Sequence, residues 1–193
     1  MIGNVAERRE RRTASIIETA WALARRESIA GLTLRGLARE LGIRQPSLYE
    51  YFDSKLALYD ALFADGNRRL LETLEAVRLP ADPRRAVKAF MRAFIAFALE
   101  DEPRRQLLFH RPIPGFEPSP ASYAPAQEVL ARAGELLDAA GVTDPGDVDC
   151  FVAMIAGLID TQASNDPGGT RWTRHLDRLI DMYIDNARPR RTR

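Results

Sequence analysis

The chain has 193 residues, of which 46% are hydrophobic and 28% are charged, and its net charge at pH 7 is +1. This composition excludes a disordered or collagen-like chain, and the single cysteine, Cys150, excludes an intrachain disulfide framework. The longest apolar run, Cys150–Ile159, is too short to span a bilayer, and the charged N-terminal region is unlike a signal peptide. We therefore expect a soluble, cytoplasmic and mainly helical protein.

The first predicted helix covers residues 6–26. Its inward stripe is formed by Ile16, Ala20 and Leu23, which recur at helical spacing. Trp21 widens this stripe, so we expect it in the core of a small helical bundle.

Residues 33–55, TLRGLARELGIRQPSLYEYFDSK, predict two short helices joined by a tight turn. Thr33 can cap the first helix, and Gly42 provides the positive φ that ends it. Pro46 is tolerated in the first turn of the second helix, which we expect over residues 45–52. Apolar residues at helical spacing face inward on both helices: Leu34, Leu37, Ala38, Leu41, Leu48 and Phe52.

Two helices joined by a short glycine-containing turn form the arrangement that enters the DNA major groove, although an ordinary helical hairpin has the same pattern. Arg44 and Gln45 are the candidates for reading base edges, because Arg prefers guanine and Gln prefers adenine. Glu50 is acidic and departs from a simple DNA-facing pattern. The other candidates of this segment, most of which would contact phosphates or sugars, are Thr33, Pro46, Ser47, Tyr49, Tyr51 and Lys55.

Arginines cluster near both ends of the chain. Such clusters are usually solvated ends, and two glutamates partly neutralise the first cluster. Beside a helix-turn-helix, the first cluster would equally serve as a set of phosphate contacts. The clusters are Arg8, Arg9, Arg11 and Arg12, and Arg188, Arg190, Arg191 and Arg193.

The helix-turn-helix residues resemble the DNA-binding signature of the TetR family of transcriptional regulators. The resemblance extends from about Thr13 to Leu62 and includes Gly31-Leu32-Thr33, Leu41-Gly42-Ile43, Leu48-Tyr49, Tyr51-Phe52 and Lys55. It implies an all-α protein of about nine helices. The implied division is a DNA-binding domain at 1–53 and a ligand-binding and dimerisation domain at 54–193.

The same resemblance implies a homodimer that forms through the last two helices, at about 145–187. Such a dimer would bind a palindromic DNA operator and respond to a small molecule. We expect a repressor that this ligand releases from its operator.

Beyond the helix-turn-helix, further helices are expected to begin at Ser54, Pro83, Glu102, Ser122, Pro145 and Trp172. The loop from residue 111 to residue 120 contains four prolines and is either a rigid connector or the cover of a pocket. Cys150 lies in an apolar run, so we expect it to be a small buried core residue.

A pocket for an apolar or aromatic ligand would need aromatic side chains, methionine and a few polar anchors. Each candidate has core packing as its alternative role. The candidates are Phe90, Phe94, Phe97, Leu108, Phe116, Tyr123, Met154 and Gln162.

No catalytic, phosphate-binding or metal-binding motif is present, and the two histidines, His110 and His175, are far apart in sequence. We therefore expect neither enzymatic activity nor a cofactor or metal. Three hypotheses remain: a ligand-responsive DNA-binding repressor, a DNA-binding dimer regulated without a small molecule, and an all-α protein that does not bind DNA.

Overall fold

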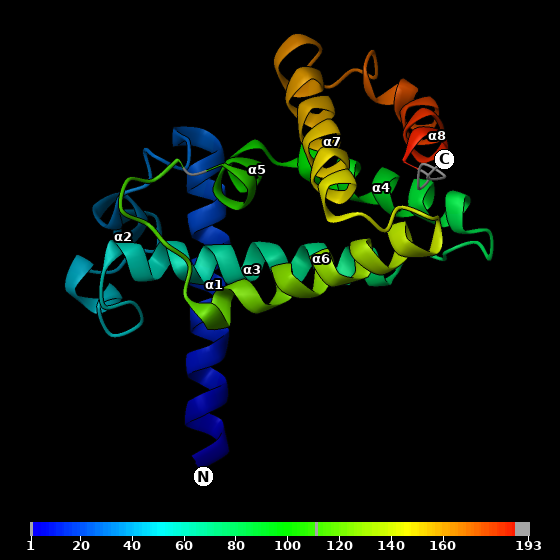
Figure 1. Cartoon of the computed structure of the whole chain (residues 1–193). Coiled ribbons are helices and arrows are strands. Elements are labelled where there is room, and N and C mark those ends of the chain that lie inside the picture. Colours follow the sequence, from blue (N-terminus) through cyan, green and yellow to red (C-terminus); the bar gives the residue numbers. More distant parts are fainter. Residues whose placement is uncertain (1, 111, 188–193) are drawn as a thin grey trace. The chain divides into compact units, whose positions relative to one another are not determined.

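The computed structural model of the chain describes residues 2–110 and 112–187 (Figure 1). Across these residues the structure consists of eight α-helices and two short 3-10 segments and contains no strand, which confirms the all-α fold class. The predicted C-terminal arginine cluster, residues 188–193, lies outside the described residues.

The helices are α1 (Ile2–Glu27), α2 (Leu34–Glu40), α3 (Lys55–Glu75), α4 (Pro83–Glu100), α5 (Glu102–Phe109), α6 (Pro120–Ala139), α7 (Pro145–Asn165) and α8 (Leu176–Asn186). The 3-10 segments are η1 (Gln45–Leu48) and η2 (Thr173–His175). Side chains cap several helix starts, and among them the oxygens of Ser54, Asp82 and Asp144 accept backbone N–H bonds from the first turns of α3, α4 and α7.

The chain divides into two compact units. The first contains the described residues up to Arg69 together with Asp101–Pro125, and the second contains Leu70–Glu100 together with the described residues from Ala126 onward. The boundary falls inside α3 because the first half of this helix belongs to the core of the first unit. The division into functional domains at 1–53 and 54–193 remains a prediction.

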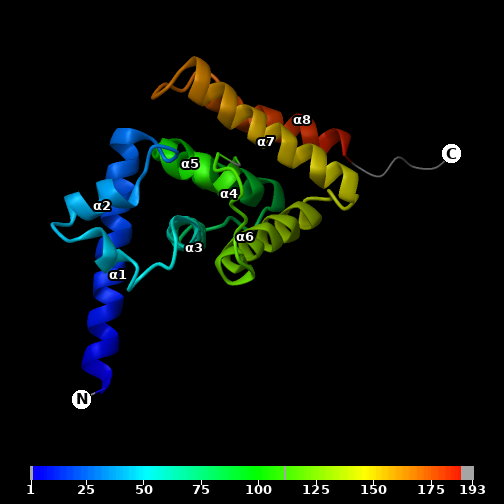
Figure 2. The same ribbon diagram turned by 90° about the vertical axis from the view of Figure 1, so that its left-hand side faces the viewer.

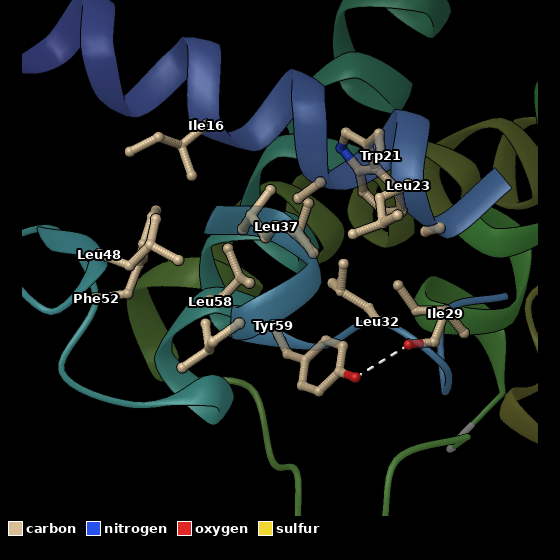
Figure 3. Packing of buried hydrophobic residues seen from close by; sticks show 14 of the residues in the cluster. Ile16, Trp21, Leu23, Ile29, Leu32, Leu37, Leu48, Phe52, Leu58 and Tyr59 are labelled. Atoms are coloured by element: carbon tan, nitrogen blue, oxygen red, sulfur yellow. Dashed lines mark hydrogen bonds between the residues drawn. The ribbon is translucent and has the colours of Figure 1, made fainter. Parts of the chain in front are cut away.

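The core of the first unit is built by α1, α2, η1 and α3 (Figure 3). Ile16 and Leu23 of α1 are fully buried, as are Leu37 of α2 and Leu48 of η1. Trp21 is 1% exposed, which confirms its predicted place in the core. In α3, the hydroxyl of buried Tyr59 donates to the backbone oxygen of Ile29 at 3.0 Å, so the loop after α1 is fastened to this core.

Asp65 of α3 joins this core to a polar network. Trp21 Nε1 donates to Asp65 Oδ2 at 2.9 Å, and Arg68 Nη2 donates to Asp65 Oδ1 at 2.7 Å. Arg69 Nε lies 2.8 Å from Asp65 Oδ2, and the same guanidinium pairs with Glu18 of α1. The carboxylate is 8% exposed, so its charge is compensated by these partners rather than by water.

A second polar cluster fastens the start of α6 to α3. Asp60 of α3 accepts hydrogen bonds from Ser119 N and Ser119 Oγ, both at 2.8 Å, and from Ser122 Oγ at 2.5 Å. Burial alone would raise the pKa of Asp60, but the hydrogen bonds from Ser122 and Ser119 outweigh it and lower the pKa below its usual value.

This lowered pKa predicts a pH-dependent contribution to stability. Because the folded pKa lies below the unfolded value, near 3.8, Asp60 stabilises the fold above that value, and the contribution is lost as pH falls through the folded pKa. In urea unfolding from about pH 7 to about pH 3, the stability difference between wild type and Asp60→Asn should therefore stay constant and then shrink below about pH 4. The control Asp53→Asn, at an exposed position, should differ less from wild type in its free energy of unfolding at every pH. A difference for Asp60→Asn that does not change with pH would contradict the prediction.

In the second unit, α4 packs against α7 and α8 (Figure 2). Phe151 of α7 meets Tyr183 of α8 edge to face, with ring centroids 5.4 Å apart. A ladder of ion pairs joins α4 to α8, with basic residues four apart facing acidic residues four apart. Its pairs are Arg84–Asp185, Lys88–Asp181 and Arg92–Asp177.

The prediction that Cys150 is buried is wrong. Its neighbour Phe151 is 1% exposed and Ile155 is 4% exposed, and these residues define the inward face of α7. Cys150 lies off this face and is exposed in the chain. An apolar run in a helix contains residues on every face, so the run alone did not fix which of them would be buried.

Candidate nucleic-acid interface

Helix α2 and the turn after it have the geometry that the sequence predicts. Thr33 Oγ1 accepts from Gly36 N at 3.0 Å, which caps the helix. Gly42 has φ of 66°, and Ile43 N donates to Ala38 O at 3.0 Å while Gly42 N donates to Arg39 O at 3.2 Å. These bonds form a Schellman motif, so the chain reverses sharply before the second element.

The second element differs from the expected helix over residues 45–52. It is a single 3-10 turn, η1, followed by turns up to Tyr51. The backbone hydrogen bonds of this segment are mainly of the short 3-10 kind, such as Tyr49 N to Pro46 O at 3.1 Å. Leu48 and Phe52 are buried as predicted, and they hold the segment on the core.

The side chains of this recognition segment, residues 44–51, lie mostly at the surface. Arg44, at the N-cap of η1, is exposed, and so are Pro46 and Tyr49, the latter at 47%. Gln45 and Ser47 are half-buried. The base-reading candidates therefore lie next to each other at the start of the segment, where no helix of the unit covers Arg44.

Three further candidates have structural partners in the chain. Tyr51 is half-buried and packs against the hydrophobic core. Lys55 Nζ lies 5.3 Å from the centre of the Tyr59 ring, a cation–π distance that gives this cation at a helix start a partner other than phosphate. Thr33 is exposed and already serves as the α2 cap, so DNA contacts of all three remain predictions.

Helix α1 also reaches the recognition segment. Arg9 Nη2 donates to the backbone oxygen of Glu50 at 2.9 Å. No sequence pattern indicated this contact, because the two residues are 41 positions apart. The contact uses the backbone oxygen of Glu50, so it does not depend on the acidic side chain, which is exposed.

Comparison with known proteins identifies this region. The model of bacterial regulatory proteins of the tetR family matches residues 16–62, which contain α2, η1 and the start of α3. An HTH-type transcriptional regulator of Mycobacterium bovis is 31% identical over 122 residues, which are 62% of this chain and 52% of that protein. The tetracycline repressor protein class C of Escherichia coli is 38% identical over 87 residues, 43% of this chain and 39% of the repressor.

The chain is similar to the TetR family over residues 16–62. It spans about half the length of the curated relatives it matches. Among solved structures, a TetR family transcriptional regulator from Thermus thermophilus has a TM-score of 0.63 at 20% identity, covering 92% of this chain and 99% of that one. A TetR protein from Acinetobacter baumannii has a TM-score of 0.56 at 22% identity, covering 89% and 93%. Both show the same fold.

Three ligand candidates lie in the first unit and have packing roles there. A Cβ atom added at Gly66 of α3 would lie only 3.1 Å from the side chain of Leu108 of α5. The glycine therefore allows α3 and α5 to approach closely. Phe116, on the proline-rich loop, lies 6.1 Å from the rings of Tyr59 and Phe63. Tyr123 stacks on Phe63 at 6.1 Å and remains 38% exposed.

The other candidates lie in the second unit. Phe90 is fully buried and Phe97 is 6% exposed, whereas Phe94 and Met154 are half-buried. Gln162 is 1% exposed and its amide is fully engaged in the loop after α7. Its Oε1 accepts from Trp172 N at 2.9 Å and Thr173 N at 3.2 Å, and its Nε2 donates to Asp166. A ligand at Gln162 would have to compete with these bonds; ligand binding by all five remains a prediction.

The last two α-helices present apolar groups to solvent. Val152 of α7 is 50% exposed and Met182 of α8 is 53% exposed. Ala156 and Gly157 are exposed beside Val152, and a side chain added at Gly157 would meet nothing within 4 Å. Small residues on an exposed apolar face permit the close approach of another helix.

Across the residues that the structure describes, no group of three His, Cys, Asp or Glu side chains is placed to hold a metal ion. None of the described helices combines the length and apolar character needed to cross a membrane.

Proposed function

We propose that this chain is a DNA-binding transcriptional regulator that inserts its recognition segment into the major groove. The observation that carries this proposal is that Arg44 is exposed beside Gln45 at the start of the recognition segment. Buried Leu48 holds this segment on the core, and the segment lies within the residues that the family model matches. Arg44 would read guanine O6 and N7, and Gln45 would read adenine N6 and N7. Ser47, Tyr49 and the other surface residues of the segment would position it on the backbone.

The active form is proposed to be a homodimer. The exposed apolar groups Val152 and Met182, with the small residues Ala156 and Gly157, support pairing through α7 and α8. A two-fold dimer would put two recognition segments in successive major grooves, roughly 34–36 Å apart, and would therefore require a palindromic site. A chromosomal DNA partner also implies that the protein works in the cytoplasm.

Release by a small apolar or aromatic ligand is the proposed regulation. Two relatives support it by their names alone: one is a tetracycline repressor, and the Acinetobacter baumannii structure is a complex with minocycline. The ligand must bind one conformation of the dimer better than the other, because equal affinity would shift nothing. The second candidate function, a DNA-binding dimer regulated without a small molecule, is favoured by the fully engaged amide of Gln162 and the complete burial of Phe90.

The proposal is tested by binding of the purified protein to duplex DNA from upstream of its own coding sequence. The variant Arg44→Ala/Gln45→Ala should lose the preference for this site over random duplex, by about 1–3 kcal/mol for each base contact removed. Its affinity for random duplex should change much less.

A matched control removes the same two residue types from α5, as Arg105→Ala/Gln106→Ala, and should keep the site preference. Circular dichroism establishes that both variants are folded. Equal site preference of wild type and the Arg44/Gln45 variant would refute the assigned base contacts. A folded wild-type dimer that binds no duplex even at low salt would refute DNA binding itself.

A further inference from the structure

We propose that the N-terminal turns of α1 form a second DNA-backbone contact, in which Arg8 and Arg12 bind phosphates beside the site that the recognition segment reads. This inference rests on the proposed DNA-binding function. It concerns a surface outside the helix-turn-helix, and outside residues 16–62 that the family model matches.

The inward stripe of α1 changes character toward its N-terminus. Ile16 and Ala20 are fully buried in the core. One turn before Ile16 the same face carries Arg12, and two turns before it carries Arg9. Figure 2 shows that this part of α1 continues beyond α2. The face that is apolar against the core thus becomes cationic where the helix leaves the bundle.

Arg9 fixes where these turns lie. Its hydrogen bond to the Glu50 backbone oxygen, at 2.9 Å, holds the first turns of α1 against the end of the recognition segment. A surface that adjoins this segment also adjoins any duplex that the segment enters. Arg9 is therefore a positioning residue, and its neighbours are the groups available for contact.

The hydrogen bonds and ion pairs of these turns show which arginines are already paired within the chain and which can bind an anion. Arg11 Nε donates to Glu7 O at 3.3 Å, and its Nη2 pairs with the Glu7 carboxylate at 3.6 Å. Neither Arg8 nor Arg12 has a hydrogen-bond or ion-pair partner among the described residues. They are four positions apart and share one face, where two like charges repel by a few tenths of a kcal/mol unless an anion lies between them.

The chemistry of the two side chains selects phosphate as that anion. A guanidinium presents paired N–H donors that match two phosphate oxygens, and it remains charged at every physiological pH. Phosphates of one DNA strand would supply the anions in series beside the groove. Such contacts add affinity without reading sequence, and they make binding more dependent on salt.

The test compares the variant Arg8→Gln/Arg12→Gln with the charge-matched control Arg11→Gln/Arg78→Gln. Glutamine keeps the helix propensity of arginine nearly unchanged. Arg11 is engaged by Glu7, and Arg78 is an exposed residue of the second unit. Binding is measured at several salt concentrations, to the upstream duplex and to a random duplex.

The slope of log affinity against log salt should become shallower by about 0.9 for each phosphate that the variant no longer neutralises, hence by about 3.6 for the four arginines replaced in a dimer. Binding of the variant to both duplexes should be weakened equally, and the control variant should keep the wild-type slope. Equal slopes for variant and control would overturn the proposal while the proposed function stands. If the variant binds only the upstream duplex more weakly, the two arginines read bases, and the proposed phosphate contact is overturned. If the wild type binds no duplex, both this proposal and the proposed function are overturned.

Discussion

Replacing Asp65 by alanine is expected to lower the free energy of unfolding by about 3 kcal/mol. The substitution leaves buried Trp21 Nε1 without its acceptor at 2.9 Å, which by itself costs about 1–3 kcal/mol. It also removes the carboxylate that compensates Arg68 and Arg69. The side chains of these arginines are 53% and 29% exposed, so water compensates part of their charge. The expected loss of free energy of unfolding is therefore near the low end of the range for breaking a buried ion pair.

The measurement is urea unfolding at fixed protein concentration, followed by far-ultraviolet circular dichroism. Asp53→Ala, at an exposed position, is the control and should change the free energy by less than about 0.5 kcal/mol. Asp65→Asn, which keeps an acceptor for Trp21, should fall between the control and Asp65→Ala. A decrease below about 1 kcal/mol for Asp65→Ala would mean that the network does not join α1 to α3 in solution.

Replacing Phe90 by alanine is expected to cost about 3–5 kcal/mol, the usual range for truncating a fully buried phenylalanine. The ring is 0% exposed, and removing it leaves a cavity that neighbouring side chains fill only partly. This prediction also bears on the ligand hypothesis. A phenylalanine that lines an open pocket touches fewer atoms, so its truncation would cost clearly less than this range.

Leu130→Ala is the control for Phe90→Ala, because Leu130 belongs to the same unit and is 53% exposed. It should cost less than about 1 kcal/mol. If the two variants lose similar stability, Phe90 is not a packed core residue, and an open cavity beside it becomes the better description. Thermal unfolding at the same protein concentration provides the second readout, since the stability of a dimer depends on concentration.

Local sequence features predicted the elements around the helix-turn-helix well. The Thr33 cap, the positive φ of Gly42 and the burial of Leu48 each depend on residues within a few positions along the chain. The short form of η1 was missed, and Pro46 gave no signal of it, because proline is tolerated in the first turn of a full α-helix. Whether the turns after a proline continue as an α-helix depends on packing against the core, which propensity does not contain.

Long-range partners could not be read in this way. Asp65 and Trp21 are 44 positions apart, and Arg9 and Glu50 are 41 apart. The α4–α8 ladder has a visible signal, charges repeated at every fourth residue, but nothing in the spacing says which acidic repeat meets which basic one. The candidate ligand residues illustrate the same difficulty, since Phe116 and Phe90 carry similar local signals and belong to different units.

By itself the sequence determined the all-helical class and the positions of the caps and turns, because these depend on short-range periodicity and on single residues with special backbone geometry. Only the tertiary structure decided which face of each helix is covered. It placed Cys150 at the surface, engaged Gln162 in a loop and set Arg9 beside the recognition segment. The physical reason is that burial and pairing depend on how helices cross, and a crossing is set by the summed packing of residues far apart in the chain.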